Sequence, residues 1–391
     1  MAWLDEYRSS LMGTVTNPFA LLDRGEGCYV WDSDGKKYLD FLAGIAVNSL
    51  GHAHPTLVKA ISDQAGKLVH VSNYFATASQ IALAERLCAI TGAGAAGRVL
   101  FGNSGAEAME AAFKLARLNG GVKKPRILTL KNSFHGRTMG SLTLTGQPAL
   151  HEGFEPLVPN VEYIDSNIQA LEQAIGPDVA ALIVEPIKGE AGVFELPDGY
   201  LESARALTES VGALLILDEI QTGIGRTGTW FAFQKSGIKP DAVAVAKGLA
   251  GGFPIGALVT FGKASELFQP GGHGSTFGGN PLATSVAMAV LEEIEHSGLI
   301  ENASLRGRQI REFLSTMDHP LISEVRGSGL LIGVGLAAPV AKALASSALE
   351  RGLIINAPKD HSIRICPPLI VGETEIESFK MLFLEALESV K

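Results

Sequence analysis

The sequence predicts an α/β fold in which a mainly parallel β-sheet, flanked by helices, forms the larger of two domains. The first observation is length, because 391 residues are too many for one ordinary hydrophobic core. The second is composition, since 46% hydrophobic and 19% charged residues are typical of a globular chain and exclude disorder as its main state. The third is an alternation of short apolar runs with helical patterns from about Arg98 onward.

The predicted strands of the larger domain are apolar on both faces. Strands of this kind belong to a parallel sheet that helices cover on each side. Two helices are predicted between these strands, over residues 104–119 and 199–211. The strands themselves are expected over residues 98–101, 126–130, 179–185, 213–218 and 241–246.

The two ends of the chain follow different patterns and predict a smaller α+β domain. Residues 28–39 alternate around the turn sequence at 32–35, which indicates a β-hairpin. A long helix over residues 281–297 precedes shorter strands over 330–336 and 362–366. We therefore expect three segments: residues 1–55 joining the smaller domain, residues 56–281 forming the larger one, and residues 282–391 completing the smaller one.

Charge and cysteine content exclude several classes of protein. Thirty-two basic and 41 acidic residues give a net charge of −9, and no basic run exceeds two residues, so no nucleic-acid partner is expected. Cys28, Cys88 and Cys366 are widely spaced and odd in number. This pattern fits neither a disulfide framework nor a zinc site, and it predicts a protein of the reducing cytoplasm.

The sequence also argues against export and membrane insertion. The charged residues Asp5, Glu6 and Arg8 lie within the first ten residues, which excludes a signal peptide there. The long uncharged segment over residues 270–291 carries five glycines and two prolines in its first twelve residues. Because a lipid-facing helix would not have this composition, no membrane span is expected.

The first candidate site lies at the start of the predicted helix over residues 104–119. Ser104 is placed to cap this helix while Glu107, three residues later, reaches back in a capping box. Gly105 would let a ligand approach the backbone closely. Free N–H groups and the helix dipole favour a phosphate at such a position, although a well-capped helix alone would explain the pattern.

Lys247 and Asp218 each lie where a buried parallel strand ends. Open α/β sheets bind ligands beyond the carboxyl ends of their strands. A lysine removed from water has a lowered pKa and can form a Schiff base with a carbonyl. Asp218 would be costly to bury without a cationic partner, and a protonated pyridine nitrogen is one such partner. The two side chains are therefore expected to converge on one small ring.

Residues 223–228 match the G-x-G-x-x-G pattern of dinucleotide-binding proteins, but their context argues against that function. A short aromatic run over residues 230–233 leaves little room for a crossover helix. Asp241 begins the next predicted strand, whereas an acid that binds ribose lies at the far end of a strand. We therefore reject a dinucleotide site.

Two arginines distant in sequence are embedded in apolar or small residues. Arg137 lies in the loop that contains Phe134, and Arg364 lies within the predicted strand over residues 362–366. A buried arginine needs an anion, and its planar guanidinium matches a carboxylate with two hydrogen bonds. A single such arginine usually forms an internal ion pair, whereas two beside a cofactor indicate a dicarboxylate ligand.

Most of these residues belong to six motifs that follow one another along the chain. Together the motifs resemble those of the class III, fold-type I pyridoxal-phosphate aminotransferases over nearly the whole chain. Within that class, LAGIAVN (42–48), GHAHP (51–55), HVSN (70–73) and NAP (356–358) are most similar to the bacterial branch that acts on N2-acetylornithine. The motifs shared with the class are NSGAEA (103–108), FHGRT (134–138), EPIKGEAG (185–192), DEIQTGIGRTG (218–228), AKG (246–248) and STFGGNP (275–281).

The resemblance implies a bound pyridoxal 5′-phosphate and a function for each matching residue. Lys247 would hold the cofactor covalently and shuttle a proton, and Asp218 would pair with the pyridine nitrogen. Phe134 would stack on the ring, and Gln221 would approach its 3′-oxygen. The other cofactor-binding residues would be Glu185, Ser104, Gly105 and Ala106, the last three around the phosphate, together with Ser275 and Thr276, which would reach the cofactor of the neighbouring subunit in a homodimer.

The resemblance also implies how two different substrates share one site. Arg364 would bind the α-carboxylate of 2-oxoglutarate or glutamate. Glu190 would pair with Arg364 when the ω-amino substrate is bound and swing away when the dicarboxylate arrives. Arg137 would bind the far carboxylate, and Asn73 is a further substrate-binding candidate. Lys188 stands where the family pattern has glutamine, and no catalytic function is assigned to it.

The activity implied is transfer of the δ-amino group of N2-acetyl-L-ornithine to 2-oxoglutarate, which gives N-acetyl-L-glutamate 5-semialdehyde and L-glutamate in arginine biosynthesis. N-succinyl-L,L-diaminopimelate, ornithine and 4-aminobutyrate remain alternative amino donors. An aminomutase or a decarboxylase on the same fold is disfavoured because Arg364 and Glu190 are both present. A non-catalytic binding protein is disfavoured because Lys247 and Asp218 are both retained.

Overall fold

The computed structural model describes residues 2–14 and 17–390, and its centre is a seven-stranded β-sheet. Strand β12 runs antiparallel to both neighbours, whereas the pairs formed by β11, β10, β7, β5 and β6 are parallel. The mainly parallel sheet is therefore confirmed. In spatial order, the strands are β4 (Arg98–Gly102), β12 (Gly256–Thr260), β11 (Ala242–Val245), β10 (Leu214–Asp218), β7 (Val179–Val184), β5 (Arg126–Leu130) and β6 (Val161–Ile164).

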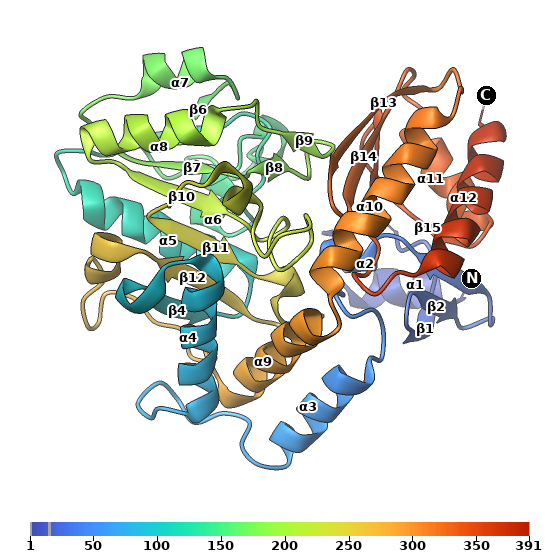
Figure 1. Cartoon of the computed structure of the whole chain (residues 1–391), viewed down its shortest axis with the longest axis horizontal. Coiled ribbons are helices and arrows are strands. Elements are labelled where there is room, and N and C mark those ends of the chain that lie inside the picture. Colours follow the sequence, from blue (N-terminus) through green and yellow to red (C-terminus); the bar gives the residue numbers. More distant parts are fainter. Residues whose placement is uncertain (1, 15–16, 391) are drawn as a thin grey trace.

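Helices cover both faces of this sheet, as Figure 1 shows. The helix α5 (Gly105–Gly120) packs on one face, in a cluster that includes Ile216 of β10. Leu215 and Leu217 point to the opposite face and join the cluster that contains α8 (Tyr200–Val211) and α9 (Pro281–His296). This alternation of side chains within one strand explains why β10 is apolar along its whole buried length.

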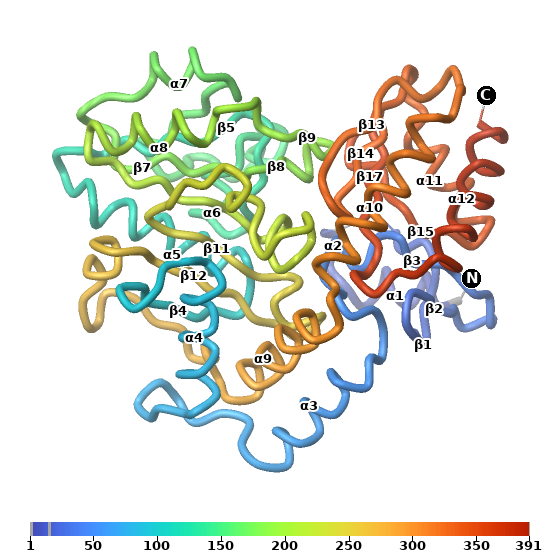
Figure 2. The backbone as a smooth tube through the Cα atoms, in the orientation of Figure 1, coloured from blue at the N-terminus to red at the C-terminus, as the bar shows by residue number. Residues whose placement is uncertain are grey.

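The N-terminal and C-terminal segments of the chain lie side by side (Figure 2). The strand β3 (Lys37–Asp40) pairs with β15 (Leu353–Ile354), with Leu39 opposite Leu353. It also pairs with β2 (Tyr29–Asp32), which confirms the predicted hairpin, and β1 (Leu22–Glu26) completes this sheet. The proposed three-segment division at residues 55 and 281 stays a prediction.

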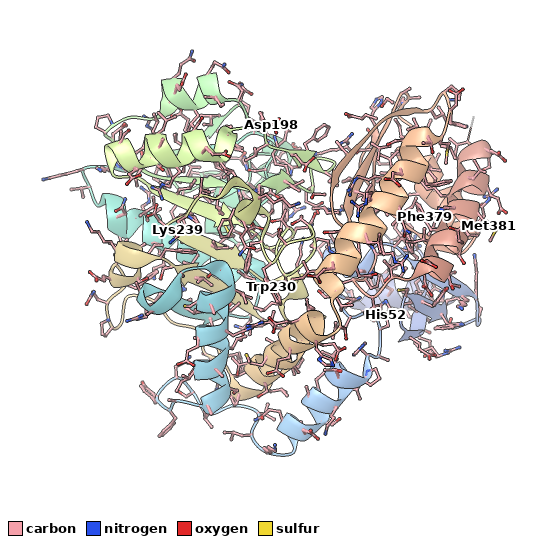
Figure 3. The ribbon with its side chains drawn as sticks, in the orientation of Figure 1. His52, Asp198, Trp230, Lys239, Phe379 and Met381 are labelled. Carbon is pink, nitrogen blue, oxygen red and sulfur yellow. The ribbon has the colours of Figure 1, made fainter. Side chains whose placement is uncertain are left out.

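A separate four-stranded sheet is built entirely from C-terminal strands, and it carries Arg364. Its strands, in spatial order, are β13 (Ile322–Ser328), β14 (Leu331–Leu336), β17 (Ser362–Ile365) and β16 (Asn356–Lys359). The helices α10 (Leu299–Thr316), α11 (Ala341–Glu350) and α12 (Glu373–Glu388) pack on these C-terminal elements. In α12, Phe379 is buried and Met381 is exposed, so the helix covers the core with one face (Figure 3).

The strands and helices predicted above are confirmed, and each boundary differs by at most one residue outside the hairpin. Strands β6, β12 and β13 were not predicted. Within residues 2–14 and 17–390, no helix combines the length and apolar character needed to cross a membrane. The remaining elements are α1 (Ala2–Ser10), α2 (Ala43–Ala46), α3 (Pro55–Ala65), α4 (Ala78–Thr91), α6 (Met139–Leu144), α7 (Ile168–Ala174), β8 (Ile187–Lys188) and β9 (Phe194–Glu195), with short 3-10 turns between them.

Candidate active site

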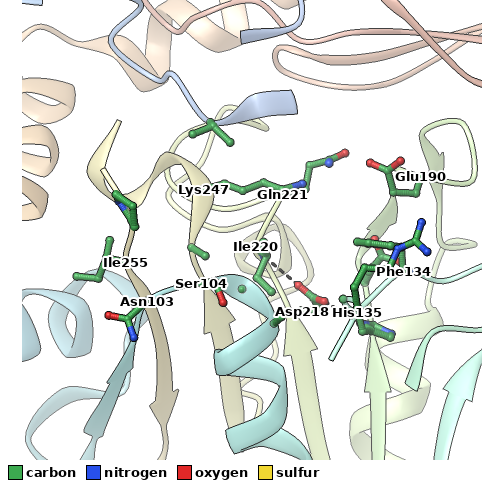
Figure 4. Close-up of a pocket in the computed structure, with 18 of the residues that line it drawn as sticks. Asn103, Ser104, Phe134, His135, Glu190, Asp218, Ile220, Gln221, Lys247 and Ile255 are labelled. Atoms are coloured by element: carbon green, nitrogen blue, oxygen red, sulfur yellow. Dashed lines mark hydrogen bonds and ion pairs between the residues drawn. The ribbon is translucent and has the colours of Figure 1, made fainter. Parts of the chain in front are cut away.

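A cavity of about 400 Å³ opens at the carboxyl ends of the central parallel strands. The segments that follow β5, β7, β10 and β11 all contribute side chains to it, as expected for an open α/β sheet. Figure 4 shows side chains from these separate segments converging on the cavity. The predicted site residues that line it are Ser104, Gly105, Ala106, Phe134, Arg137, Glu185, Glu190, Asp218, Gln221 and Lys247.

Lys247 is placed in the cavity by a strained turn immediately after β11. Its backbone has φ of 44°, in the left-handed region that side-chain-bearing residues seldom occupy. Such strain persists only where the surroundings impose it, and it is common at functional sites. Loss of contact with water lowers the pKa of the Lys247 amine, although the nearby Glu190 carboxylate opposes this shift. A lysine with a lowered pKa is a better nucleophile towards a carbonyl.

Asp218, the last residue of β10, is bonded to a histidine that the sequence did not single out. The Nδ1 of His135 lies 2.7 Å from Asp218 Oδ2, and both side chains are buried. The other ring nitrogen of His135 lies 3.2 Å from Thr129 Oγ1. Burial opposes protonation of the ring, but Asp218 outweighs it and raises the pKa of His135. His135 belongs to the FHGRT motif, but no function was predicted for it from the sequence.

The start of α5 forms the third part of the cavity wall. Ser104 caps the helix as predicted, because its side chain accepts a hydrogen bond from the Glu107 N–H at 3.2 Å. The predicted capping box is wrong in one respect, since the Glu107 carboxylate accepts from the backbone and the side chain of Asn103, both at 2.9 Å. A Cβ on Gly105 would lie 2.9 Å from the end of the Ile220 side chain, so a larger residue there would have to displace Ile220. The first N–H groups of α5 have no intrahelical partner and suit an anion.

Arg364 forms an ion pair with Glu190, and Glu190 lines the cavity. The Arg364 guanidinium, fully buried in β17, donates through Nη1 to Glu190 Oε1, and its Nε donates to Asn356 Oδ1 at 3.1 Å. Burial opposes ionisation of Glu190, but the Arg364 charge outweighs it and lowers the pKa of that carboxyl. Among the residues that the structure describes, Arg364 Nη2 is buried with no hydrogen-bond partner. An unsatisfied buried guanidinium N–H is suited to a carboxylate ligand.

Gln221 and Glu185 complete the inner wall. Gln221 Oε1 accepts from Arg364 Nη1 at 3.3 Å, and a Cβ on Gly189 would lie only 1.7 Å from this oxygen. The space that Gln221 occupies therefore exists only because residue 189 is glycine. Glu185 accepts from the Phe134 N–H at 2.9 Å, and burial raises the pKa of Glu185 to about 7.

Arg137 lies at the open side of the cavity. Its side chain is exposed, and its guanidinium carbon lies 5.8 Å from the centroid of the Phe134 ring. The expectation that Arg137 is embedded among apolar residues was wrong, because only its sequence neighbours are small or apolar. An exposed guanidinium at this place remains able to attract an anion as it enters.

Four predicted residues do not line the cavity of this chain: Arg364, which is buried behind Glu190, and Asn73, Ser275 and Thr276. Asn73 and Thr276 border a separate small groove, where Asn73 Nδ2 donates to the Ser275 carbonyl at 3.0 Å. The Ser275 hydroxyl accepts from Asn103 Nδ2 at 3.0 Å, so this groove adjoins the start of α5. Lys188 is buried away from the cavity and donates to Ser166 Oγ at 2.6 Å. Sequence reasoning also missed the cavity residues Val47, Ile220, Phe253, Pro254 and Ile255.

Comparison with known proteins shows the family. The family model of aminotransferase class-III matches residues 12–387. The chain belongs to the class III aminotransferases. It is 48% identical to the acetylornithine aminotransferase of Streptomyces coelicolor, over 96% of this chain and 92% of that protein. It is also 48% identical to the acetylornithine aminotransferase of Mycobacterium tuberculosis, over 95% of this chain and 93% of that protein.

Solved structures of aminotransferases share the fold. The ornithine aminotransferase of Toxoplasma gondii matches with a TM-score of 0.94 and 33% identity, over 99% of this chain and 94% of that one. The acetylornithine aminotransferase of Elizabethkingia anophelis matches with a TM-score of 0.87 and 32% identity, over 99% and 98%. Another structure of the Toxoplasma gondii enzyme has PLP at partial occupancy in its active site.

The cofactor of this class III aminotransferase is pyridoxal 5′-phosphate, and the cavity offers groups that fit it. The start of α5 suits the phosphate, and Gly105 leaves space that a larger residue would fill. The Asp218 carboxylate, fixed by His135, suits a protonated pyridine nitrogen. Lys247 supplies an amine for the aldehyde. Within the described part of the chain, no three His, Cys, Asp or Glu side chains are grouped so as to hold a metal ion.

Proposed function

We propose that this enzyme transfers the δ-amino group of N2-acetyl-L-ornithine to 2-oxoglutarate, which produces N-acetyl-L-glutamate 5-semialdehyde and L-glutamate for arginine biosynthesis. The near full-length relatives at 48% identity are acetylornithine aminotransferases, which supports this donor. The observation that carries the proposal is the Arg364–Glu190 pair beside Lys247, because it suits a site that alternates between a cationic and a neutral wall.

Bound pyridoxal phosphate supplies an electron sink that eases removal of a proton from the amine-bearing carbon. Lys247 removes this proton from the δ-carbon of the donor when its own amine is free. Because burial lowers its pKa and favours the neutral amine, Lys247 is suited to act as this base. Asp218 would accept a hydrogen bond from the pyridine nitrogen and keep it protonated, and His135 fixes the Asp218 carboxylate.

Arg364 and Glu190 together accommodate two substrates that differ in charge. When N2-acetylornithine is bound, the δ-carbon near the cofactor carries no carboxylate, so Arg364 needs another anion, and Glu190 provides it. When 2-oxoglutarate is bound, its α-carboxylate takes the place of Glu190 on Arg364. A fixed unpaired arginine would favour only the second substrate. Arg137 would bind the carboxylate at the far end of either substrate.

A homodimer in the cytoplasm is part of the same proposal. Asn73, Ser275 and Thr276 lie outside the cavity of their own chain, which supports a contribution to the neighbouring site. Large apolar side chains near them are exposed, including Tyr74 at 93% and Phe75 at 67%. Apolar exposure of this kind marks an interaction surface. The cysteines Cys28, Cys88 and Cys366 are all free, which suits a reducing compartment.

A single half-reaction tests the proposed donor. Protein loaded with pyridoxal phosphate is mixed with N2-acetylornithine and no keto acid, and the visible absorbance of the cofactor is followed. We expect the absorbance to shift on addition of the donor and to return on addition of 2-oxoglutarate. Persistence of the original spectrum would contradict N2-acetylornithine as donor. N-succinyl-L,L-diaminopimelate, ornithine and 4-aminobutyrate, assayed in parallel, would then identify which alternative replaces it.

A further inference from the structure

Arg326 lies outside the cavity, in β13, yet it shares a cross-strand row with Arg364. Arg326 is paired with Gly333 of β14, and Gly333 is paired with Arg364 of β17. Directly opposed residues in a sheet project from the same face, so both guanidinium groups leave the sheet on one side. A Cβ on Gly333 would lie 3.2 Å from Arg326 Cγ and 2.7 Å from the Gly192 carbonyl oxygen. Because residue 333 has no side chain, the Arg326 side chain can pass over it to reach the Gly192 carbonyl.

The Arg326 guanidinium binds the turn that contains Glu190. We call residues 189–193 the Glu190 turn. The Gly192 carbonyl accepts hydrogen bonds from Arg326 Nε at 2.9 Å and from Arg326 Nη2 at 2.6 Å. Arg326 Nη2 also donates to Ser362 Oγ at 2.6 Å, and Ser362 donates to the same Gly192 carbonyl at 3.2 Å. Ser362 precedes Arg364 by two residues, so one guanidinium joins the segments that carry both members of the ion pair.

The Glu190 turn has a backbone that needs such support. Val193 is fully buried with φ of 63°, an unfavourable conformation for a β-branched residue, and Gly192 has φ of 119°. Strained residues persist where the surrounding structure holds them. Arg326 is itself fixed, because its guanidinium carbon lies 3.9 Å from the centroid of the Phe194 ring and its Nη1 donates to Glu324 at 2.5 Å.

We propose that Arg326 is a positioning residue that holds the Glu190 turn against the C-terminal sheet and thereby keeps Glu190 paired with Arg364 during the amino-donor half-reaction. This inference rests on the proposed function of that pair. Without Arg326 the turn loosens, and Arg364 presents more of its charge to a donor that has no carboxylate for it. Binding of a dicarboxylate, which must displace Glu190, does not depend on this support.

The test compares Arg326→Lys with wild type in the enzyme loaded with pyridoxal phosphate. Lysine keeps the positive charge but cannot donate the two hydrogen bonds that Arg326 Nε and Nη2 make to the Gly192 carbonyl. We expect the KM for N2-acetylornithine to rise about five- to tenfold, the scale of one ordinary hydrogen bond, because lysine can still make one of the contacts. The Kd for glutarate, an unreactive dicarboxylate measured by calorimetry, should stay the same or fall. Equal weakening of both would overturn the inference, because loss of fold would affect both substrates alike.

Two further variants keep the test decisive. Arg306→Lys is a matched control, because Arg306 bonds Asn302, Gln309 and Glu373 on the outer side of the C-terminal helices, and it should change neither constant. Ser362→Ala removes one contact of the same network and should raise the donor KM by a smaller factor. If Arg326→Lys does not fold, the donor KM of Ser362→Ala provides the test instead. An unchanged donor KM in both Arg326→Lys and Ser362→Ala would refute the inference.

A double-mutant cycle links the effect to Glu190. In a Glu190→Gln background, Arg326→Lys should have little further effect on the donor KM, because the carboxylate that it positions is gone. If the effects of Arg326→Lys and Glu190→Gln on the donor KM were fully additive, the inference would be overturned. Failure of the proposed donor is recognised separately, since wild-type enzyme would then not convert N2-acetylornithine at all. The KM of whichever donor the half-reaction identifies, compared with glutarate binding, would still report on Arg326.

Discussion

The Nδ1 of His135 lies 2.7 Å from the Oδ2 of Asp218, and this contact fixes the carboxylate at the end of β10 that faces the cavity. The second oxygen of Asp218 accepts from the Ile220 N–H at 3.0 Å. Both carboxylate oxygens are thus held by the protein before any ligand binds. A carboxylate fixed in this way loses little freedom when it pairs with a pyridine nitrogen.

Replacing His135 with glutamine should destabilise the protein in a pH-dependent manner. Since the folded-state pKa of His135 is raised, its stabilisation is complete below the unfolded pKa of about 6.5 and is lost as the pH rises through the higher folded value. We expect a Tm difference between wild type and His135→Gln that is largest near about pH 6 and smaller near about pH 9. A difference that grows with pH would contradict a protonated His135.

Replacing Lys247 with alanine should abolish turnover and covalent retention of the cofactor. Among the residues described, no other lysine lines the cavity. The guanidinium of Arg137 also borders it, but a guanidinium stays protonated and is a poor nucleophile. We expect at least about a 10³-fold fall in kcat. Lys263→Ala serves as the control, because this exposed lysine follows β12 at the opposite end of the sheet from Lys247. Retained turnover in Lys247→Ala with cofactor bound would exclude the proposed mechanism.

Replacing Glu190 with glutamine should separate the two half-reactions. The change leaves Arg364 buried without an anionic partner when N2-acetylornithine binds, so the donor KM should rise roughly tenfold. The KM for 2-oxoglutarate should change little, because that substrate brings its own carboxylate to Arg364. Steady-state kinetics with each substrate varied in turn measures both constants. A parallel rise in the two would argue against an alternating pair.

Replacing Gly189 with alanine should displace Gln221 from the cavity wall. The new methyl group would lie 1.7 Å from Gln221 Oε1, so the side chain or the turn must move. A displacement of about 1 Å near reacting groups costs about 10² in kcat/KM. Gly66→Ala is the matched control, because the nearest atom to its added Cβ is a carbonyl oxygen at 3.6 Å. Full activity of Gly189→Ala would show that the position of Gln221 is unimportant.

The central sheet could be predicted because its strands are apolar on both faces and its helices have clear periodicity. Lys247 and Asp218 could be singled out for the same reason, since each is a polar residue directly after such a strand. The antiparallel direction of β12 could not be predicted, because its residues resemble those of a parallel strand. A short apolar run does not indicate its own direction.

The site contacts that were not predicted depend on the order of the strands in the sheets, and this order cannot be read from the sequence. His135 follows β5, and Asp218 ends β10; they meet because only β7 lies between these strands in the sheet. Arg326 is equally hidden, because its strand, ISEVRGS, has no regular alternation of polar and apolar residues. Its proximity to Arg364 follows from the pairing of three strands through Gly333.

The pairing of Leu39 with Leu353 has a consequence for synthesis on the ribosome. The N-terminal hairpin emerges early, but the strand that completes its sheet emerges only near the end of translation. Until then, Phe41 and Cys28, both buried in the finished protein, lack part of their cover. We therefore expect nascent chains stalled before residue 353 to react with a thiol reagent at Cys28, and released full-length chains to be protected.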